Sequence, residues 1–310
     1  MSRDAYHAQA GAGQAGDNLP PLAVALSGGL GNQLFQAAAA VSLARRCNAR
    51  CEFDLAFYKA GRSQRYALGP FPHGAATRNY QPIGKAVRLT DRIRHWTGIT
   101  TRVPQATWAG ARYEQPGFGF DPAFHALTAP CHIAGYFQSP KFFADDAGRI
   151  IEMFHPRHLN ARIDAHRAMA DPDNTVSVHV RRGDYVANAR VAAVHGALGA
   201  GYYRDAFEAL RSSVQAPRFL VFSDDLAAAR GMLGQPADTT FVDGGSAAGD
   251  LWLMSLCRHH IIANSSFSWW GAFFDQRAGG RVIAPRQWFT DQALLTRPVQ
   301  DLFPHHWTVL

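Results

Sequence analysis

Two adjacent arginines, Arg181 and Arg182, follow the apolar run VSVHV and precede Gly183-Asp184. Arginine is permanently charged, and its planar fork of N–H donors suits bidentate contact with a phosphate or a diphosphate. An Arg-Arg pair after a strand is more often a solvated surface pair. Here its place at the end of an expected strand and before a glycine turn favours a diphosphate site. Asp184 then either belongs to that site or holds an arginine by an ion pair.

A second polar cluster, NSSFS at residues 264 to 268, offers hydroxyl and amide groups immediately before the apolar stretch WWGAFF. The unpaired backbone N–H groups and the dipole of a helix N-terminus favour an anion. Ser265, Ser266 and Ser268 are also typical helix-capping residues, and the same atoms serve either purpose. We expect Trp269 and Trp270 to belong to the hydrophobic core.

The glycine-rich segment SGGLGNQ, residues 27 to 33, lies between an expected strand and an expected helix. It resembles a phosphate-binding loop, but it has neither the G-x-G-x-x-G spacing of dinucleotide sites nor the Gly-Lys-Ser/Thr ending of ATP sites. The segment is therefore either a tight strand-to-helix turn or a ligand-binding loop. Asn32 and Gln33, at the expected helix start, indicate hydrogen bonding to a polar ligand.

No segment of the sequence has a convincing set of metal ligands. Asp171-Pro172-Asp173 has the spacing of a carboxylate pair that holds the metal of a nucleotide-sugar diphosphate, but the central proline predicts a turn. The pairs His259-His260 and His305-His306 lack further ligands at metal-binding spacing. We expect no metal and no other cofactor.

Short apolar runs of strand length alternate with helical stretches along most of the chain, a pattern typical of doubly wound parallel sheets. In the first half, strands are expected at residues 22–26, 51–57 and 132–139, and helices at 34–46 and 141–154. In the second half, strands are expected at 176–180, 218–223, 239–243, 260–266 and 281–285, and helices at 201–214, 226–233, 249–259 and 268–274. Residues 60 to 130 show only weak periodicity.

Parallel sheets of this kind bind ligands outside the carboxyl ends of their strands. Residues 179–184, 223–225 and 264–268 all follow expected strands, so we expect them to converge on one crevice. A polar stretch at residues 155–174 marks the expected boundary between two domains.

Composition limits the class of protein. The 310 residues are 47% hydrophobic and 18% charged, which describes a globular chain with a sizeable core and excludes disorder. The four cysteines show neither a CxxC pair nor dense spacing, so we expect reduced thiols. The formal charge of +7 indicates an anionic partner, but no Lys/Arg block is long enough for nucleic acid. Without a secretory signal or a long apolar run, the expected location is cytoplasmic.

Four segments together resemble one enzyme family: SGGLGNQLFQ at 27–36, HVRRGDY at 179–185, VFSDD at 221–225 and DLWLMSLCRHHIIANSSFSWWGAFF at 250–274. In order and spacing they are similar to the alpha-1,2-fucosyltransferases of glycosyltransferase family 11, and the chain resembles a bacterial member. The resemblance implies an α/β fold of the glycosyltransferase-B type, with two Rossmann-like domains and a cleft between them. We expect a disordered tail at 1–19, an N-terminal domain on the acceptor side at 20–160, and a C-terminal domain that binds GDP-fucose at 161–310.

The resemblance also implies an activity and roles for individual residues. The reaction would be the inverting, metal-independent transfer of L-fucose from GDP-fucose to the 2-hydroxyl of a galactose-type residue. In the C-terminal domain, Arg181 and Arg182 would hold the diphosphate, His179 and Asp184 would shape the donor site, and Ser223 with Asp224 would receive the guanine or ribose. The remaining donor-site residues implied are Asn264, Ser265, Ser266, Phe267 and Ser268 around the phosphates, and Gly29, Gly31 and Asn32 from the other domain.

Two carboxylates are candidates for the base that takes the proton of the acceptor hydroxyl. Asp184 is the nearest to the arginines in sequence, but an ion pair with them would make it too acidic for a good base. We therefore favour an orienting role for Asp184. Asp54, at the end of the second strand of the other domain, is the second candidate.

Two alternatives remain at the level of sequence. A protein O-fucosyltransferase would share the arginine motif, but such enzymes work on secreted targets, and the absent signal sequence argues against this class. A non-catalytic nucleotide- or glycan-binding module is disfavoured by the complete set of polar clusters. Bacterial relatives commonly build surface polysaccharides, so analogy indicates a galactose-containing, lipid-linked acceptor and at most peripheral contact with the inner membrane face.

Overall fold

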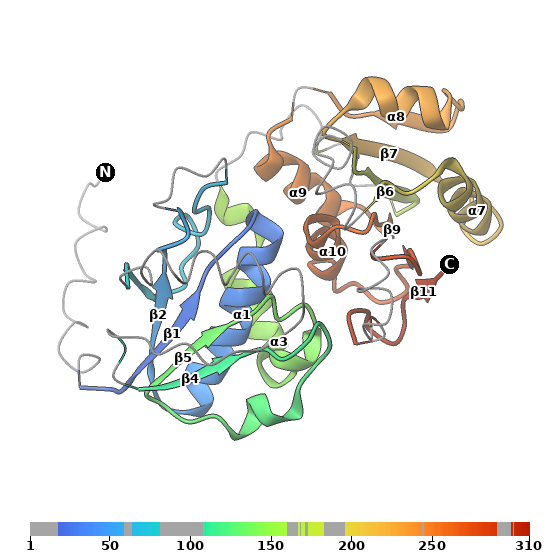
Figure 1. Cartoon of the computed structure of the whole chain (residues 1–310). Helices are drawn as coiled ribbons and strands as arrows, with labels where there is room; N and C mark the ends of the chain where they lie inside the picture. Colours follow the sequence, from blue (N-terminus) through green and yellow to red (C-terminus); the bar gives the residue numbers. More distant parts are fainter. Residues whose placement is uncertain are drawn as a thin grey trace, which may run out of the picture.

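The computed structural model describes residues 18–58, 64–80, 108, 110–159, 167, 169–170, 173–182, 196–243, 245–289, 299 and 301–310. Asp184, Asp171-Pro172 and residues 1–17 lie outside these ranges, so the expectations placed on them stay predictions. Within them, two separate sheets occupy the two halves of the chain (Figure 1). Among the described helices, none is both long and apolar enough to cross a membrane.

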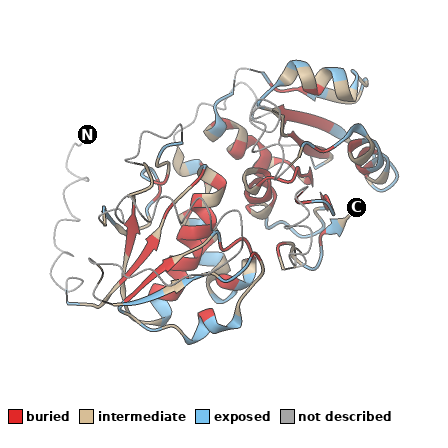
Figure 2. Ribbon diagram, in the orientation of Figure 1, coloured by how far each residue is buried: buried red, intermediate tan, exposed pale blue. Residues whose placement is uncertain are grey.

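The N-terminal half is built on a five-stranded, entirely parallel sheet with the order β3-β2-β1-β5-β4. Its strands are β1 Pro21–Ala25, β2 Arg50–Asp54, β3 Ala76–Arg78, β4 Ala111–Glu114 and β5 Cys131–Ala134. Helix α1, Leu30–Arg46, crosses from β1 to β2 and is buried along most of its length (Figure 2). Its run of four alanines favours helix and allows close packing, and Arg45 and Arg46 complement the negative end of its dipole.

The segment after β5 differs from the single helix expected over 141–154. Two short 3-10 turns, Pro140–Phe142 and Ala144–Asp146, precede α3, Ala147–Met153, and a third turn at Pro156–Leu159 follows it. Phe142 and Phe143 are adjacent and both are 1% exposed. Successive residues of an α-helix point about 100° apart, so the break at Phe143 lets both rings enter the core. A further 3-10 turn, Pro122–Ala126, precedes β5.

The C-terminal half contains a six-stranded parallel sheet with the order β11-β10-β9-β6-β7-β8. Its strands are β6 Thr175–Val180, β7 Arg218–Ser223, β8 Thr239–Phe241, β9 His259–Ile261, β10 Val282–Ala284 and β11 Thr308–Val309. Its helices are α7 Ala200–Arg211, α8 Leu226–Leu233, α9 Ala247–Leu256 and α10 Ser266–Phe273. Two parallel α/β sheets confirm the expected fold class.

Three strands, β3, β4 and β11, were not expected from the sequence. β3 and β11 contain only three and two residues, too few to show a periodicity. β4 has the sequence ARYE and lies at the edge of its sheet, mostly exposed. It therefore lacks the apolar alternation by which a strand is recognised.

Helix α10 connects the two halves through its aromatic side chains. Trp269 and Trp270 are both 0% exposed, as expected for core residues. The ring of Phe35 in α1 lies 4.4 Å from that of Trp269, and Phe143 stacks on Trp270 at 5.7 Å. In Figure 1, α10 accordingly lies beside α1, between the two sheets.

Candidate functional site

The arginine pair emerges from the carboxyl end of β6 and is fixed by the neighbouring strand. Val180 pairs with Ser223 of β7, so Arg181 and Asp224 each follow a paired residue. Arg181 Nη1 lies 2.9 Å from Asp224 Oδ2, and the backbone N–H of Arg182 donates to Asp224 Oδ1 over 2.8 Å. Both carboxylate oxygens of Asp224 therefore contact the arginine segment.

Two buried nitrogen atoms beside this ion pair lack a hydrogen-bond partner among the described residues: Arg182 Nε and His179 Nδ1. Buried polar atoms are normally hydrogen-bonded, so two such nitrogens side by side mark the end of β6 as a candidate ligand site. Burial and the positive charge of Arg181 lower the pKa of His179 to about 3. The imidazole is therefore neutral at physiological pH.

The residues before α10 shape a helix N-terminus. Ser265 is the N-cap, and its Oγ accepts from the Phe267 N–H over 3.4 Å. Ser268 Oγ accepts from the Ala263 N–H over 3.2 Å and donates to the Ser265 carbonyl over 3.3 Å. The capping function expected of these serines is confirmed for Ser265.

Asn264 and Ser223 also have structural contacts. Asn264 is 2% exposed, and its amide donates to the carbonyls of Gly196 at 3.0 Å and Trp288 at 3.4 Å. Ser223 Oγ accepts from the Asp225 N–H and donates to the Asp225 carbonyl, both over 3.0 Å. These contacts hold the loops that follow β9 and β7 in place.

The helix expected from residue 34 begins earlier, at Leu30, so Gly31, Asn32 and Gln33 form its first turn. Gly28, with a φ of +78°, makes the tight turn before it. Gln33 is 0% exposed and holds neighbouring backbone: its amide donates to Gly28 at 3.0 Å and Arg65 at 2.9 Å. The segment is thus a strand-to-helix turn, and Gln33 serves the fold.

The first turns of α1 and α10 meet each other. Ser266 Oγ donates to Asn32 Oδ1 over 2.7 Å, and the Gln138 amide donates to the same oxygen over 2.8 Å. A Cβ on Gly31 would lie 2.5 Å from both the Phe267 nitrogen and the Ser266 carbonyl carbon. Only glycine allows this approach.

The positive ends of both helix dipoles lie where these two helix N-termini meet. The N-cap of α1 is Gly29, which provides no capping side chain, and the first turn contains no acidic residue. The ring centroid of Phe267, in the first turn of α10, lies 5.7 Å from that of His179, which brings this helix end next to the arginine strand. Guanidinium groups and the positive ends of two helix dipoles together suit a diphosphate.

Asp54, the other candidate base, lies at the carboxyl end of β2 and is 7% exposed. Its Oδ2 contacts His132 Nε2 at 3.1 Å, and its Oδ1 accepts from the N–H groups of Ala56 at 3.0 Å and Tyr80 at 3.3 Å. His132 was missed by the sequence analysis because it is one polar residue within the strand CHIA. Asp54 and His132 lie on β2 and β5, which are separated by β1 in the sheet. Only the folded sheet therefore brings the two side chains together.

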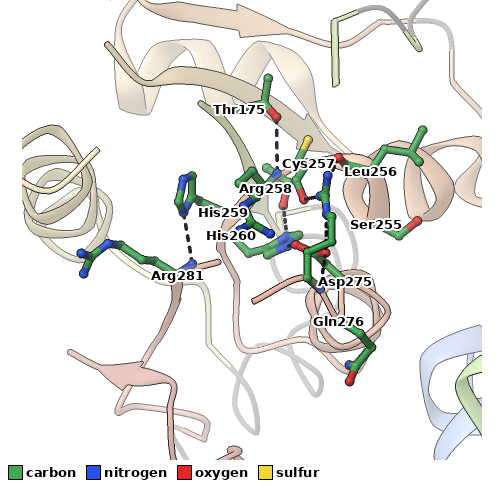
Figure 3. Close-up of polar contacts among 12 residues, drawn as sticks. Thr175, Ser255, Leu256, Cys257, Arg258, His259, His260, Asp275, Gln276 and Arg281 are labelled. Carbon is green, nitrogen blue, oxygen red and sulfur yellow. Dashed lines mark hydrogen bonds and ion pairs between the residues drawn. The ribbon is translucent and has the colours of Figure 1, made fainter. Parts of the chain in front are cut away.

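The histidine pair His259-His260 lies at the opposite, amino end of the C-terminal sheet (Figure 3). His259 Nδ1 accepts from the Arg281 N–H over 3.1 Å. His260, 1% exposed, lies 2.8 Å from Ser177 Oγ and 3.6 Å from the carboxylate of Asp275. These contacts are structural. Within the described ranges, no group of three His, Cys, Asp or Glu side chains is arranged to hold a metal ion.

Several known proteins are similar to this chain over most of its length. An alpha-1,2-colitosyltransferase of Escherichia coli is 30% identical over 281 residues, which cover 87% of this chain and 92% of that protein. The O-antigen biosynthesis glycosyltransferase WbnK of Escherichia coli is 29% identical over 290 residues, covering 85% and 93% of the two chains. The fucosyltransferase NodZ from Bradyrhizobium, a solved structure, aligns with a TM-score of 0.49 and 15% identity over 82% of this chain and 92% of its own.

The model of the family described as "Glycosyl transferase family 11" matches residues 113–310. This range contains the arginine pair, its partner Asp224 and the N-terminus of α10. It covers more than half of the chain, and the chain therefore belongs to glycosyltransferase family 11.

Proposed function

We propose that this protein transfers L-fucose from GDP-β-L-fucose to the 2-hydroxyl of a galactose-type residue of a glycan, with inversion and without a metal ion. The observation that carries the proposal is the state of the arginine pair. Asp224 holds Arg181, while the buried Nε of Arg182 has no hydrogen-bond partner among the described residues. The two helix N-termini beside it complete a cradle for the diphosphate of the donor.

The charge movement in the reaction explains why these groups suit it. The bond between the anomeric carbon and the β-phosphate oxygen breaks as the bond to the acceptor oxygen forms on the opposite face. Negative charge grows on the leaving diphosphate, and preorganised donors stabilise it. In our proposal Arg182 and Arg181 supply these donors, and His179, neutral, hydrogen-bonds without adding charge.

The acceptor hydroxyl loses its proton as the new bond forms. We propose Asp54, paired with His132, or Asp184 as the base, so that each domain contributes one candidate. Asp54 has its orientation fixed by two backbone N–H groups and one imidazole. A carboxylate held in this way is a preorganised proton acceptor once the acceptor sugar is in place.

The remaining donor-site residues keep the roles that the family resemblance implies. Asn264 and Ser265 to Ser268 form the α10 side of the diphosphate site, and Gly29, Gly31 and Asn32 form the α1 side. Ser223 and Asp224 border the side where the nucleoside is expected.

The acceptor proposal rests on the relatives. One relative is named an O-antigen biosynthesis glycosyltransferase. A bovine protein that also matches this chain is named a galactoside 2-alpha-L-fucosyltransferase. We propose a galactose-containing glycan acceptor, in lipid-linked form at the cytoplasmic face of the inner membrane. A second candidate activity is alpha-1,2-colitosyl transfer, because a relative with that name matches 87% of the chain.

The test is a donor and acceptor panel with mass detection of the product. The purified chain is given GDP-fucose and a nucleotide-linked colitose, each with β-galactosides, other hexosides and peptides. We expect one deoxyhexose added to galactosides from GDP-fucose. Arg182→Ala should abolish transfer, while Arg204→Ala, which removes a side chain that is 77% exposed, should not. Preference for colitose selects the second candidate, and GDP binding without any transfer overturns the enzyme proposal.

A further inference from the structure

Two adjacent tyrosines on α7, Tyr202 and Tyr203, each donate a hydroxyl hydrogen bond to the backbone of the C-terminal sheet. Tyr202 bonds the carbonyls of Ile262 at 2.7 Å and Ile283 at 3.2 Å, in and beside β9 and β10. Tyr203 bonds the carbonyl of His179 at 3.0 Å, in β6. Neighbouring helix positions point about 100° apart, so the two rings reach different strands.

The hydrogen bond from Tyr203 reaches β6 near its carboxyl end, just before the arginine pair. The paired register of β6 with β9 ends at Val178, one residue before the carbonyl that Tyr203 engages. Arg181 follows His179 by two residues. The path of the chain into the arginine pair is therefore fixed from two sides: Asp224 holds the Arg182 N–H and the Arg181 side chain, and Tyr203 holds the carbonyl of His179.

Tyr203 is also electrically coupled to this site. It is 1% exposed, and burial is the main reason why its pKa lies above the ordinary value for tyrosine. The charges of Arg182 and Asp224 act on it in opposite directions. The phenol is therefore protonated at neutral pH and remains a hydrogen-bond donor.

We infer that Tyr203 is a positioning residue for the diphosphate clamp: its hydroxyl sets the backbone from which Arg181 and Arg182 project. The inference rests on the proposed function. It predicts that loss of this hydroxyl weakens recognition of the diphosphate and leaves recognition of the nucleoside and of the acceptor unchanged. Tyr113 supplies a control, because Tyr113→Phe also removes one hydroxyl hydrogen bond, to Asp121 at 2.8 Å, but does so in the N-terminal sheet.

The experiment compares Tyr203→Phe and Tyr113→Phe with the parent protein by calorimetric titration of GDP and guanosine, with thermal melting of each protein. Loss of one neutral hydrogen bond corresponds to about three- to tenfold in affinity. We expect Tyr203→Phe to raise the Kd for GDP and the KM for the donor by this factor, and to leave the Kd for guanosine and the KM for the acceptor unchanged. Tyr113→Phe should also melt earlier than the parent, yet it should bind GDP like the parent.

A double-mutant cycle separates positioning from general loosening. In an Arg182→Ala background, Tyr203→Phe should weaken GDP binding by a smaller factor than in the parent, because one of the two guanidinium groups through which it acts is gone. The inference is overturned if Tyr203→Phe binds GDP like the parent, if GDP and guanosine weaken equally, or if the two effects simply add. A parent protein that binds neither compound overturns the proposed function itself, and this inference with it.

Discussion

Arg181 and Asp224 form an ion pair of 2.9 Å at the ends of two neighbouring strands. The pair gives the two arginines different tasks. Arg181 is already engaged by a carboxylate, whereas the buried Nε of Arg182 has no partner among the described residues. We therefore propose that Arg182 is the guanidinium that contacts the diphosphate of the donor most directly.

Arg182→Lys should be impaired far more than Arg181→Lys. Lysine keeps the charge but cannot make the planar two-bond contact of a guanidinium. Removal of one transition-state donor typically costs about a hundred- to a thousandfold in turnover. Initial rates at saturating GDP-fucose measure the effect. An Arg182→Lys enzyme within about threefold of the parent would show that guanidinium geometry is irrelevant to the reaction.

Replacement of the candidate bases should separate their roles. Asp54→Asn is expected to lower turnover about a hundredfold while GDP affinity stays within about twofold, because only proton acceptance is lost. Asp184→Asn is expected to weaken GDP binding and turnover together, because we expect Asp184 to orient the arginines that bind GDP. Calorimetry with GDP beside initial rates gives both quantities. Collapsed turnover with unchanged GDP affinity in Asp184→Asn alone would make Asp184 the base.

Activity should persist in excess chelator. In the proposed mechanism, arginine donors and helix N-termini provide the positive charge that a metal ion would otherwise supply. We expect rates within about twofold of the untreated enzyme after dialysis against EDTA. Loss of most activity that manganese or magnesium restores would contradict the metal-free mechanism.

Gly31→Ala should destabilise the protein, and Gly29→Ala should have a much smaller effect. A methyl group on Gly31 would lie 2.5 Å from backbone atoms of α10, whereas the space around Gly29 is open. Overpacking of this kind costs about 1–3 kcal/mol, or roughly 1.5 to 5 °C in Tm for a chain of this size. Thermal unfolding of the two variants measures the difference. Equal melting temperatures would show that α1 and α10 can separate without cost.

The protein should lose stability as the pH falls below about 6.5, the ordinary pKa of histidine. The folded state holds the pKa of His179 at about 3, so between these values the unfolded chain binds a proton that the folded chain does not. Stability therefore rises with pH across this window, and a drop from pH 7 to pH 5 costs about 2 kcal/mol from this residue.

Urea unfolding at both pH values checks the effect of His179. The His179→Gln variant should lose about 2 kcal/mol less than the parent between pH 7 and pH 5. The surface variant His125→Gln should follow the parent. An identical pH loss in His179→Gln would assign the acid sensitivity to other groups.

The sequence was most informative where strands are buried on both faces. β6 repeats valine at every second residue and β7 contains the apolar run FLVF, so their carboxyl ends, and with them Arg181 and Asp224, could be placed from sequence alone. The ion pair between these two residues could not, because it depends on the register of the two strands. His132 shows the same limit: it contacts Asp54 across 78 residues of chain, and nothing local marks it.

The start of α1 shows a different limit. Gly31 and Asn32 read as loop residues because glycine disfavours a helix interior. The structure tolerates Gly31 in the first turn because α10 approaches it closely, and that neighbour lies 235 residues away in the chain. The short edge strands β3, β4 and β11 likewise form because a sheet is present beside them.

The contact of Trp269 and Trp270 with Phe35 and Phe143 has a consequence for exchanging parts between family members. Although α10 follows β9 in the chain, its indole rings belong to the same core as α1. A chimera joined at the expected domain boundary, residues 155–174, would place these rings against the N-terminal half of another protein. Acceptor specificity should therefore be transplanted together with α10, or by loop grafts that leave the four rings as they are.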